Sequence, residues 1–427
     1  MLKTFINAWK VADMRAKLIF TAIILVLFRL GCVIPVPYFD SAVLQATFNS
    51  AEGSVFQYLN ILSGEAFARG TLFALSVSPY ITAQIIMQLL TIAIPALERV
   101  AKEGEEGRKK IEAWTRYVTV ILAVITAYGY YAWLKSLTGV LTDTGAFAGI
   151  VIVATYTAGA ALVMWLAEKI NEHGIGNGIS MILFANIVSS LPSMILGIVL
   201  NPDSIIFKII AAVLTAVIII LIVAFVVFVT NSERRIPVQY AKKVVGRKMY
   251  GGQNSSLPIK LNMSGVMPII FAQSIVSIPA TLQLIFNPEA GSFWYKAFNA
   301  VSYQSPVYAI VLFLLIIAFA YFYLAISFNP VEVANNIKKN GGVVLGIRPG
   351  KPTADYITKI LSRVTLIGAL FLGVIAILPM VVAIVVPSLG NISFGGTSLL
   401  IVVGVALETV REIESQLMLR NYSGFLD

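Results

Sequence analysis

The sequence predicts an all-α, polytopic membrane protein with ten transmembrane helices. Hydrophobic residues make up 58% of the 427-residue chain and charged residues only 12%, about half of the roughly 25% that is usual in soluble domains. Lipid solvates such a chain better than water does. Because a helix needs roughly 20 apolar residues to cross a bilayer, the length allows about ten spans with their loops.

Ten apolar stretches follow one another along the chain, separated by polar loops. The predicted spans are 17–37, 71–95, 115–135, 147–167, 178–200, 206–230, 263–286, 306–328, 362–386 and 394–411. Another apolar segment, at 55–67, is too short to cross a bilayer. We expect a half-helix there that protein surrounds, because lipid cannot satisfy its frayed backbone. A plug, a re-entrant lining and a flat interfacial helix are all compatible with it.

The basic residues predict the orientation. Of the 31 lysines and arginines, 26 fall on the side that carries the N-terminus, four on the opposite side, and Arg29 inside the first span. Lysine and arginine accumulate in cytoplasmic loops of membrane proteins. Both termini are therefore predicted to be cytoplasmic, as an even number of spans requires. Arg29 is expected to face protein or to reach toward an interface.

The loop at 231–262 has more basic residues than topology alone needs. It contains seven lysines and arginines against one acid, Glu233, and it is longer than a tight helix connection. The lysines and arginines either only keep these loops on the cytoplasmic side or also dock a negatively charged partner. Both interpretations stay open at this point.

The polar residues of the spans exclude several function classes. Cys32 and His173 are the only cysteine and the only histidine, so we predict no disulfide framework, metal site or cofactor. The middle of the spans contains no acid, which argues against a transporter driven by ions or protons. Neither a phosphate-binding loop nor a nucleophile elbow occurs, so no enzyme is predicted. No cleavable signal peptide is expected.

Prolines interrupt several predicted spans. Pro79 lies in the second, Pro268 and Pro279 in the seventh, and Pro379 in the ninth. Proline inside a membrane helix usually produces a tolerated kink. Broken helices also occur in gated channels and in secondary transporters of small solutes, so this pattern alone leaves both classes open.

Six motifs resemble those of the SecY family, in order along nearly the whole chain. They are GTLFALSVSPYITAQIIMQLL at 70–90, WLAEKINEHGIGNGIS at 165–180, AKKVVGR at 241–247, LPIKLNMSGVMPIIFA at 257–272, GIRPG at 346–350 and FGGTSLLIVVGV at 394–405. The resemblance implies the pore-forming subunit of the bacterial Sec protein translocase. It implies two inverted five-helix halves, 1–200 and 201–427, that hinge between the fifth and sixth spans.

The resemblance also implies a passive, gated conduit for unfolded polypeptide. An apolar ring would close the centre, and matched by motif position it consists of Val77, Ile81, Ile179, Leu183, Ile270 and Ile401. Leu183 stands where isoleucine is expected, and the register at Ile270 is open by a few residues. In the family the segment at 55–67 is the plug, for which this chain supplies Phe56, Tyr58, Leu59, Ile61, Leu62, Gly64 and Phe67.

The family further implies a lateral gate and several partners. The gate would lie between spans two and three on one side and seven and eight on the other, and would release hydrophobic segments into lipid. The partners would be the SecE and SecG subunits, the SecA motor ATPase, the ribosome, signal peptides, unfolded preproteins and membrane lipid. Docking would use the loops 231–262 and 329–361, with Arg247, Lys248 and Arg348. The implied location is the bacterial plasma membrane.

Overall fold

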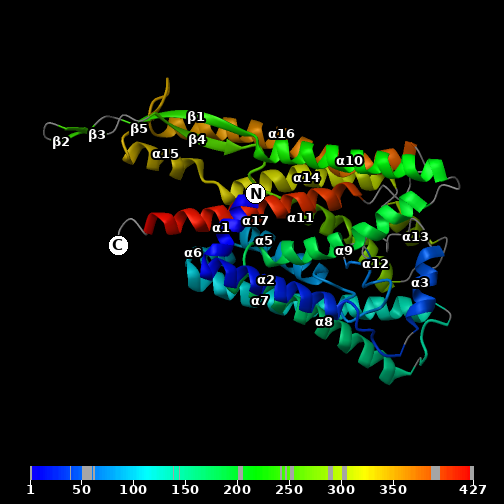
Figure 1. Cartoon of the computed structure of the whole chain (residues 1–427). Helices are drawn as coiled ribbons and strands as arrows, with labels where there is room; N and C mark the ends of the chain where they lie inside the picture. Colours follow the sequence, from blue (N-terminus) through cyan, green and yellow to red (C-terminus); the bar gives the residue numbers. More distant parts are fainter. Residues whose placement is uncertain are drawn as a thin grey trace.

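The computed structural model describes most of the chain and arranges it as a bundle of long helices (Figure 1). The described residues are 2–38, 40–50, 60, 63–137, 139–143, 145–200, 205–240, 243–245, 248–250, 254–286, 292–300, 305–385 and 395–423. The C-terminal part of α17 lies toward the end of the bundle that also carries the strands, whereas α3 lies at the other end (Figure 1).

The helices have these bounds: α1 Leu2–Lys10, α2 Ala12–Gly31, α3 Ser41–Ser50, α5 Ser78–Ala93, α6 Pro95–Lys102, α7 Glu105–Ser136, α8 Ala146–His173, α9 Gly178–Leu200, α10 Ile205–Asn231, α11 Met267–Val276, α12 Ile278–Phe286, α13 Phe293–Ala300, α14 Pro306–Ser327, α15 Pro330–Lys339, α16 Lys351–Val385 and α17 Gly395–Ser423. Every predicted span contains one of these helices, which confirms the mostly helical fold class. Among the described residues, four helices are long and apolar enough to cross a membrane, or five if the pair α5 and α6, bent by 101°, counts as one.

The first predicted span, 17–37, is helical only to Gly31, and two further predicted spans are interrupted. The stretch 71–95 is helical only from Ser78 and is preceded by turns at 72–77, where Ser76 has a φ of 49°. The stretch 263–286 is split at Ser277 into α11 and α12. Pro79 and Pro268 lie in the first turns of α5 and α11, where a missing N–H has no cost. These two prolines therefore begin helices, and the predicted kinks at them are wrong.

The basic loops contain a small sheet that composition did not predict. β1 (Glu233–Tyr240) pairs antiparallel with β4 (Asn254–Lys260) and with β5 (Gly342–Val344). A hairpin of β2 (Lys243–Val245) and β3 (Lys248–Tyr250) extends beyond it. Alternate residues of β1, Ile236 and Val238, point into a separate apolar cluster with Ile357 of α16. The loops 231–262 and 329–361 thus form one folded unit.

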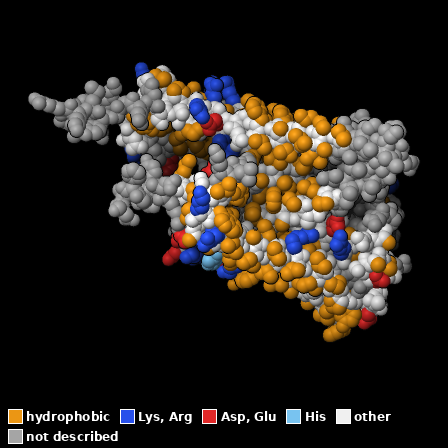
Figure 2. Space-filling model, in the orientation of Figure 1, with side chains coloured by type: hydrophobic (Ala, Val, Ile, Leu, Met, Phe, Trp, Pro, Cys, Tyr) orange, Lys and Arg blue, Asp and Glu red, His pale blue; other side chains and the backbone are white. Residues whose placement is uncertain are grey.

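The outer flank of the bundle is apolar. Figure 2 shows hydrophobic side chains along the flank that faces the viewer. Large aliphatic and aromatic residues are more than half exposed on several helices, for example Leu27, Tyr117, Ile150, Leu221 and Ile310. Exposed apolar surface on this scale requires a nonpolar environment. The described surface is therefore that of a membrane protein.

Close helix packing depends on glycine at one position of α8. A Cβ at Gly159 would overlap the backbone carbonyl of Leu72, which belongs to the turns before α5. Glycine permits such a close backbone approach, as small residues do between membrane helices. The turns that precede α5 are held in place by this contact.

Replacing Gly159 by valine should lower the free energy of unfolding by about 1–3 kcal/mol, since overpacking displaces the neighbouring backbone. Thermal unfolding of the detergent-solubilised chain, followed by tryptophan fluorescence, measures the change. Ala158→Val adds a side chain at the neighbouring exposed position and should leave the unfolding temperature nearly unchanged. Equal unfolding temperatures for the two variants would contradict the role assigned to this contact.

Candidate functional site

Six apolar side chains from four helices are buried in one large apolar cluster of the bundle. Val77 and Ile81 belong to the start of α5, Ile179 and Leu183 to α9, Ile270 to α11, and Ile401 to α17. Each is between 0% and 3% exposed, and all belong to the same apolar cluster. The structure therefore brings together all six residues that the sequence assigned to an apolar ring, and we call this set the central ring.

The helices around the central ring form a closed circuit. α5 contacts α11, α11 contacts α17, α17 contacts α9, α9 contacts α8, and α8 contacts α5. A narrow passage lined by branched apolar side chains resists wetting and blocks ions. The packing of the central ring is therefore suited to a seal between the two ends of the bundle.

A carboxylate on α17 fixes the start of α11. The Glu408 Oε1 atom accepts a hydrogen bond of 3.2 Å from the Val266 backbone N–H. Gly265 next to it has a φ of 62°, and a Cβ there would overlap the same carboxylate. Because the first N–H groups of a helix lack partners within the helix, Glu408 satisfies one at this terminus. This contact sets the position of Ile270, one turn further along α11.

The segment predicted as a plug is described only in its last part. Phe56, Tyr58, Leu59, Ile61 and Leu62 lie outside the described residues.

The part that is described, 63–70, is a run of turns. Phe67 is buried against Tyr130 and Trp133 of α7, and its carbonyl accepts a 2.6 Å hydrogen bond from the Tyr130 hydroxyl. It packs in a cluster separate from the central ring, whereas the neighbouring Ala66 belongs to the same cluster as the central ring.

Arg29, within the first predicted span, lies against this segment at Gly64. Its Nη1 atom donates to the Asn186 Oδ1 atom of α9 at 3.5 Å, and Asn186 Nδ2 donates to Ser76 Oγ at 3.0 Å. Gly64 lies directly against both side chains: a Cβ there would come within 2.7 Å of Arg29 Nη1 and 2.9 Å of Asn186 Oδ1. The expectation that Arg29 faces protein is confirmed. We call Arg29, Asn186 and Ser76 the polar latch.

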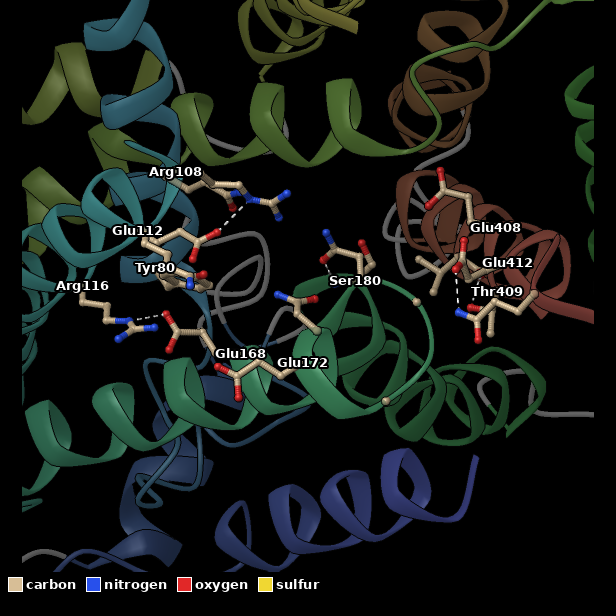
Figure 3. A pocket seen from close by; sticks show the side chains of 18 of the residues that line it. Tyr80, Arg108, Glu112, Arg116, Glu168, Glu172, Ser180, Glu408, Thr409 and Glu412 are labelled. Atoms are coloured by element: carbon tan, nitrogen blue, oxygen red, sulfur yellow. Dashed lines mark hydrogen bonds and ion pairs between the residues drawn. The ribbon is translucent and has the colours of Figure 1, made fainter. Parts of the chain in front are cut away.

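A cavity of about 840 Å³ is lined by residues of α5, α7, α8, α9 and α17. Tyr80 and Ser180, which line it, are the sequence neighbours of the ring residues Ile81 and Ile179. Figure 3 shows Arg108, Glu112 and Arg116 of α7 on one side of the cavity and Glu408, Thr409 and Glu412 of α17 on the other. The cavity therefore borders the segments of α5 and α9 that carry Ile81 and Ile179, and we call it the vestibule.

Several charges of this vestibule are paired. Arg108 Nε lies 3.0 Å from Glu112 Oε1, and Arg116 Nε lies 2.8 Å from Glu168 Oε1. The hydrogen bond from Lys169 holds the pKa of the Glu172 carboxyl below its ordinary value, so Glu172 is ionised at neutral pH. Within the described ranges no three histidine, cysteine or acidic side chains gather in a way that could hold a metal ion.

The residues predicted to dock a partner are only partly described. Lys248 begins β3, while Arg247 lies outside the described residues. Arg348 is exposed in the turn between β5 and α16, and its carbonyl accepts a 2.8 Å hydrogen bond from Thr353 Oγ1. Among the residues that the structure describes, none forms a hydrogen bond or an ion pair with the Arg348 guanidinium.

The glutamates that form the walls of the vestibule were not predicted from the sequence. Glu168 and Glu172 on α8 are four residues apart, as are Glu408 and Glu412 on α17. This spacing places like charges on one helix face, where they repel each other. The repeated spacing was a readable signal of a shared function, but the sequence did not reveal that the two faces meet across one cavity.

Comparison with known proteins gives one consistent result. A model of the SecY family matches residues 71–410. The chain is 44% identical to the protein translocase subunit SecY of Streptomyces scabiei over 441 residues, which covers 100% of both chains.

Two solved structures share the fold. One is a structure of SecY whose plug domain is described as stabilising the closed state of the translocation channel; it has a TM-score of 0.63 and 20% identity, and covers 94% of this chain and 92% of its own. The other is Sec61 in the canine ribosome-channel complex from the endoplasmic reticulum, with a TM-score of 0.61, 18% identity and the same two coverages.

Replacing Asn186 by leucine should release the turns at 63–70, because Arg29 loses its amide acceptor and Ser76 its donor. Losing such buried hydrogen bonds costs about 1–3 kcal/mol. Hydrogen–deuterium exchange of the amides in 63–77 should become faster. Ser189→Ala, one turn further along α9, removes only a hydroxyl that bonds to the backbone of its own helix and serves as the control. Unchanged exchange in Asn186→Leu would rule out the latch.

Proposed function

Because the chain belongs to the SecY family, whose members are protein-conducting channels, we propose that its central ring is the constriction through which unfolded polypeptides pass. The chain is the channel subunit of a protein translocase. The observation that carries the assignment of the constriction is that the six side chains from four helices are all buried in one apolar cluster, and that the vestibule borders α5, α9 and α17, which carry five of them.

The chemistry of the central ring suits a passive conduit. Its aliphatic side chains offer a passing chain no fixed hydrogen bonds, so that many different sequences can slide through, while the closed ring excludes water and ions. We propose that the channel carries no catalytic step and that a partner supplies the energy.

We propose that the segment 55–67 is the plug and that the polar latch holds its described end in the resting state. The lateral gate would lie where α5 contacts α11 and α7 contacts α12. Tyr323 of α14 donates a 3.3 Å hydrogen bond to Gln88 of α5 across this boundary. These contacts support a closed gate that opens when the halves 1–200 and 201–427 separate, with the hinge between α9 and α10.

The docking surface is proposed to be the folded unit built from the loops 231–262 and 329–361, with Arg247, Lys248 and Arg348. Its partners would be the SecA motor ATPase and the ribosome, and SecE and SecG would complete the channel. An exposed arginine suits bidentate pairing with a carboxylate or phosphate. We place the protein in the bacterial plasma membrane with both termini in the cytoplasm, as the distribution of lysine and arginine favours.

Replacing Ile81 or Ile401 by glycine should make the resting channel leak ions, because the shortened side chain lets water enter the constriction. The measurement is ion efflux from proteoliposomes that contain the purified chain. Ile150→Gly makes the same change at a position that is 67% exposed on the outer flank and should remain tight. A tight resting pore in both ring variants would disprove the assigned constriction.

Replacing Arg348 by glutamate should reduce SecA-driven import of a precursor into proteoliposomes by at least roughly tenfold, since reversing a charge at a close interfacial pair costs several kcal/mol. Thermal stability should not change, because the side chain is exposed and only the Arg348 carbonyl is bonded. Lys135→Glu reverses a charge on the opposite predicted face and serves as the control. Normal import by Arg348→Glu would refute the docking role.

A further inference from the structure

The first helix of the chain packs against the last one. α1 contacts both α2 and α17 (Figure 1). Ala8 of α1 and Met14 of α2 form an apolar cluster with Ile175, from the segment between α8 and α9, and with Ile413 of α17. Each of the four is at most 2% exposed, and none of them belongs to the cluster that contains the central ring. We call these four residues the terminal cluster.

The terminal cluster joins the two proposed halves of the chain. Three of its residues belong to the half 1–200, whereas Ile413 belongs to the half 201–427. Ile413 lies on the part of α17 that continues beyond the predicted span 394–411, as far as Ser423. α17 is therefore attached to the N-terminal half by a contact outside its predicted span.

Two side-chain hydrogen bonds support the terminal cluster. The Thr4 Oγ1 atom of α1 donates to Glu414 Oε1 at 3.0 Å, and the Lys17 Nζ atom of α2 donates to Gln416 Oε1 at 3.1 Å. Both acceptors follow Ile413 within one turn of α17. Because α1 and α2 each bond to this turn, they hold its rotation as well as its distance.

The segment that carries Ile175 is fixed to the same support. The Ile175 backbone N–H donates to Thr21 Oγ1 of α2 at 3.1 Å. A Cβ at Gly174 would come within 2.6 Å of the same hydroxyl oxygen, so this close approach requires glycine. α1, α2 and the segment between α8 and α9 therefore form one support on which α17 rests.

The terminal cluster uses none of the helices of the proposed lateral gate. The gate was assigned to α5 and α7 against α11 and α12, whereas the cluster is built from α1, α2, α17 and the segment between α8 and α9. The two contacts between the halves can consequently change independently. The gate can open while the terminal cluster stays closed.

We infer that α1 is a positioning element of the channel. Through the terminal cluster it keeps α17, and with it Ile401 of the central ring, attached to the N-terminal half when the halves separate at the gate. The inference rests on the proposed function and goes beyond it, because it assigns a role to a helix that neither the central ring nor the docking surface uses.

The first test places a charge in the terminal cluster. Ala8→Glu should detach α1 from α17, since a charge buried without a partner is costly. Ala12→Glu adds the same side chain at a nearby exposed position and is the matched control. Spin labels at the exposed positions Asn7 and Ser415, on a Cys32→Ala background, report the distance between α1 and α17. Double electron–electron resonance should give one narrow distance in the control and a broad distribution in Ala8→Glu.

The displaced α17 should also weaken the seal. Ion efflux from proteoliposomes with the resting channel should be faster for Ala8→Glu than for Ala12→Glu, because Ile401 is carried by α17. Thermal unfolding of both variants checks that each is folded. A narrow distance in Ala8→Glu, or equal efflux from the two variants, would overturn the inference.

The second test needs no substitution in the terminal cluster. The distance between labels at Asn7 and Ser415 is compared with that between labels at Leu89 of α5 and Ala325 of α14, which are exposed beside the proposed gate. Both are measured in the resting channel and with a precursor stalled during SecA-driven import. The gate distance should increase while the distance from α1 to α17 stays constant.

An equal increase of both distances would contradict the positioning role. A gate distance that does not change would instead contradict the proposed lateral gate. In that case the comparison of Ala8→Glu with Ala12→Glu still decides whether α1 positions α17, so the two failures are distinguishable.

Discussion

The exclusion of water from the centre of the bundle is the constraint on which the remaining structure depends. In the proposed seal, four helices must bring branched side chains to one level with no charge among them. Other features serve that arrangement. The Glu408 carboxylate fixes where α11 begins, and the turns at 72–77 deliver Val77 and Ile81 to the centre, where both are 1% exposed.

The exterior loops and the vestibule carry charge of opposite sign. The exterior loops are basic, which orients the chain in the membrane and suits partners with phosphate or carboxylate groups. The vestibule inside this basic rim is acidic. The proposed docking surface and the vestibule therefore differ in the sign of their charge.

The sequence alone predicted those features that are encoded by a local pattern or by a family motif. The apolar stretches located the helices, and the family motifs selected the six residues of the central ring, which composition could not distinguish from ordinary packing residues. The alternation of Ile236 and Val238 was readable as a strand, but pairing of Val238 with Val344 joins segments about a hundred residues apart, and no local pattern encodes that. The helix start at Ser78 was missed because apolar composition does not reveal the positive φ of Ser76.

The chemistry of the polar latch determines how firmly it can hold. A buried arginine paired with a carboxylate would cost about 3–5 kcal/mol to separate, whereas a single hydrogen bond to a charged group contributes about 1.5–3 kcal/mol. The hydrogen bond from Arg29 to the Asn186 amide oxygen is long, at 3.5 Å. Its contribution therefore lies at or below the lower end of this range, about 1.5 kcal/mol. In the proposed plug role, an anchor of this strength would order the turns around Gly64 in the resting state. It would also leave a barrier that the binding energy of a substrate could overcome, which a buried ion pair would raise further.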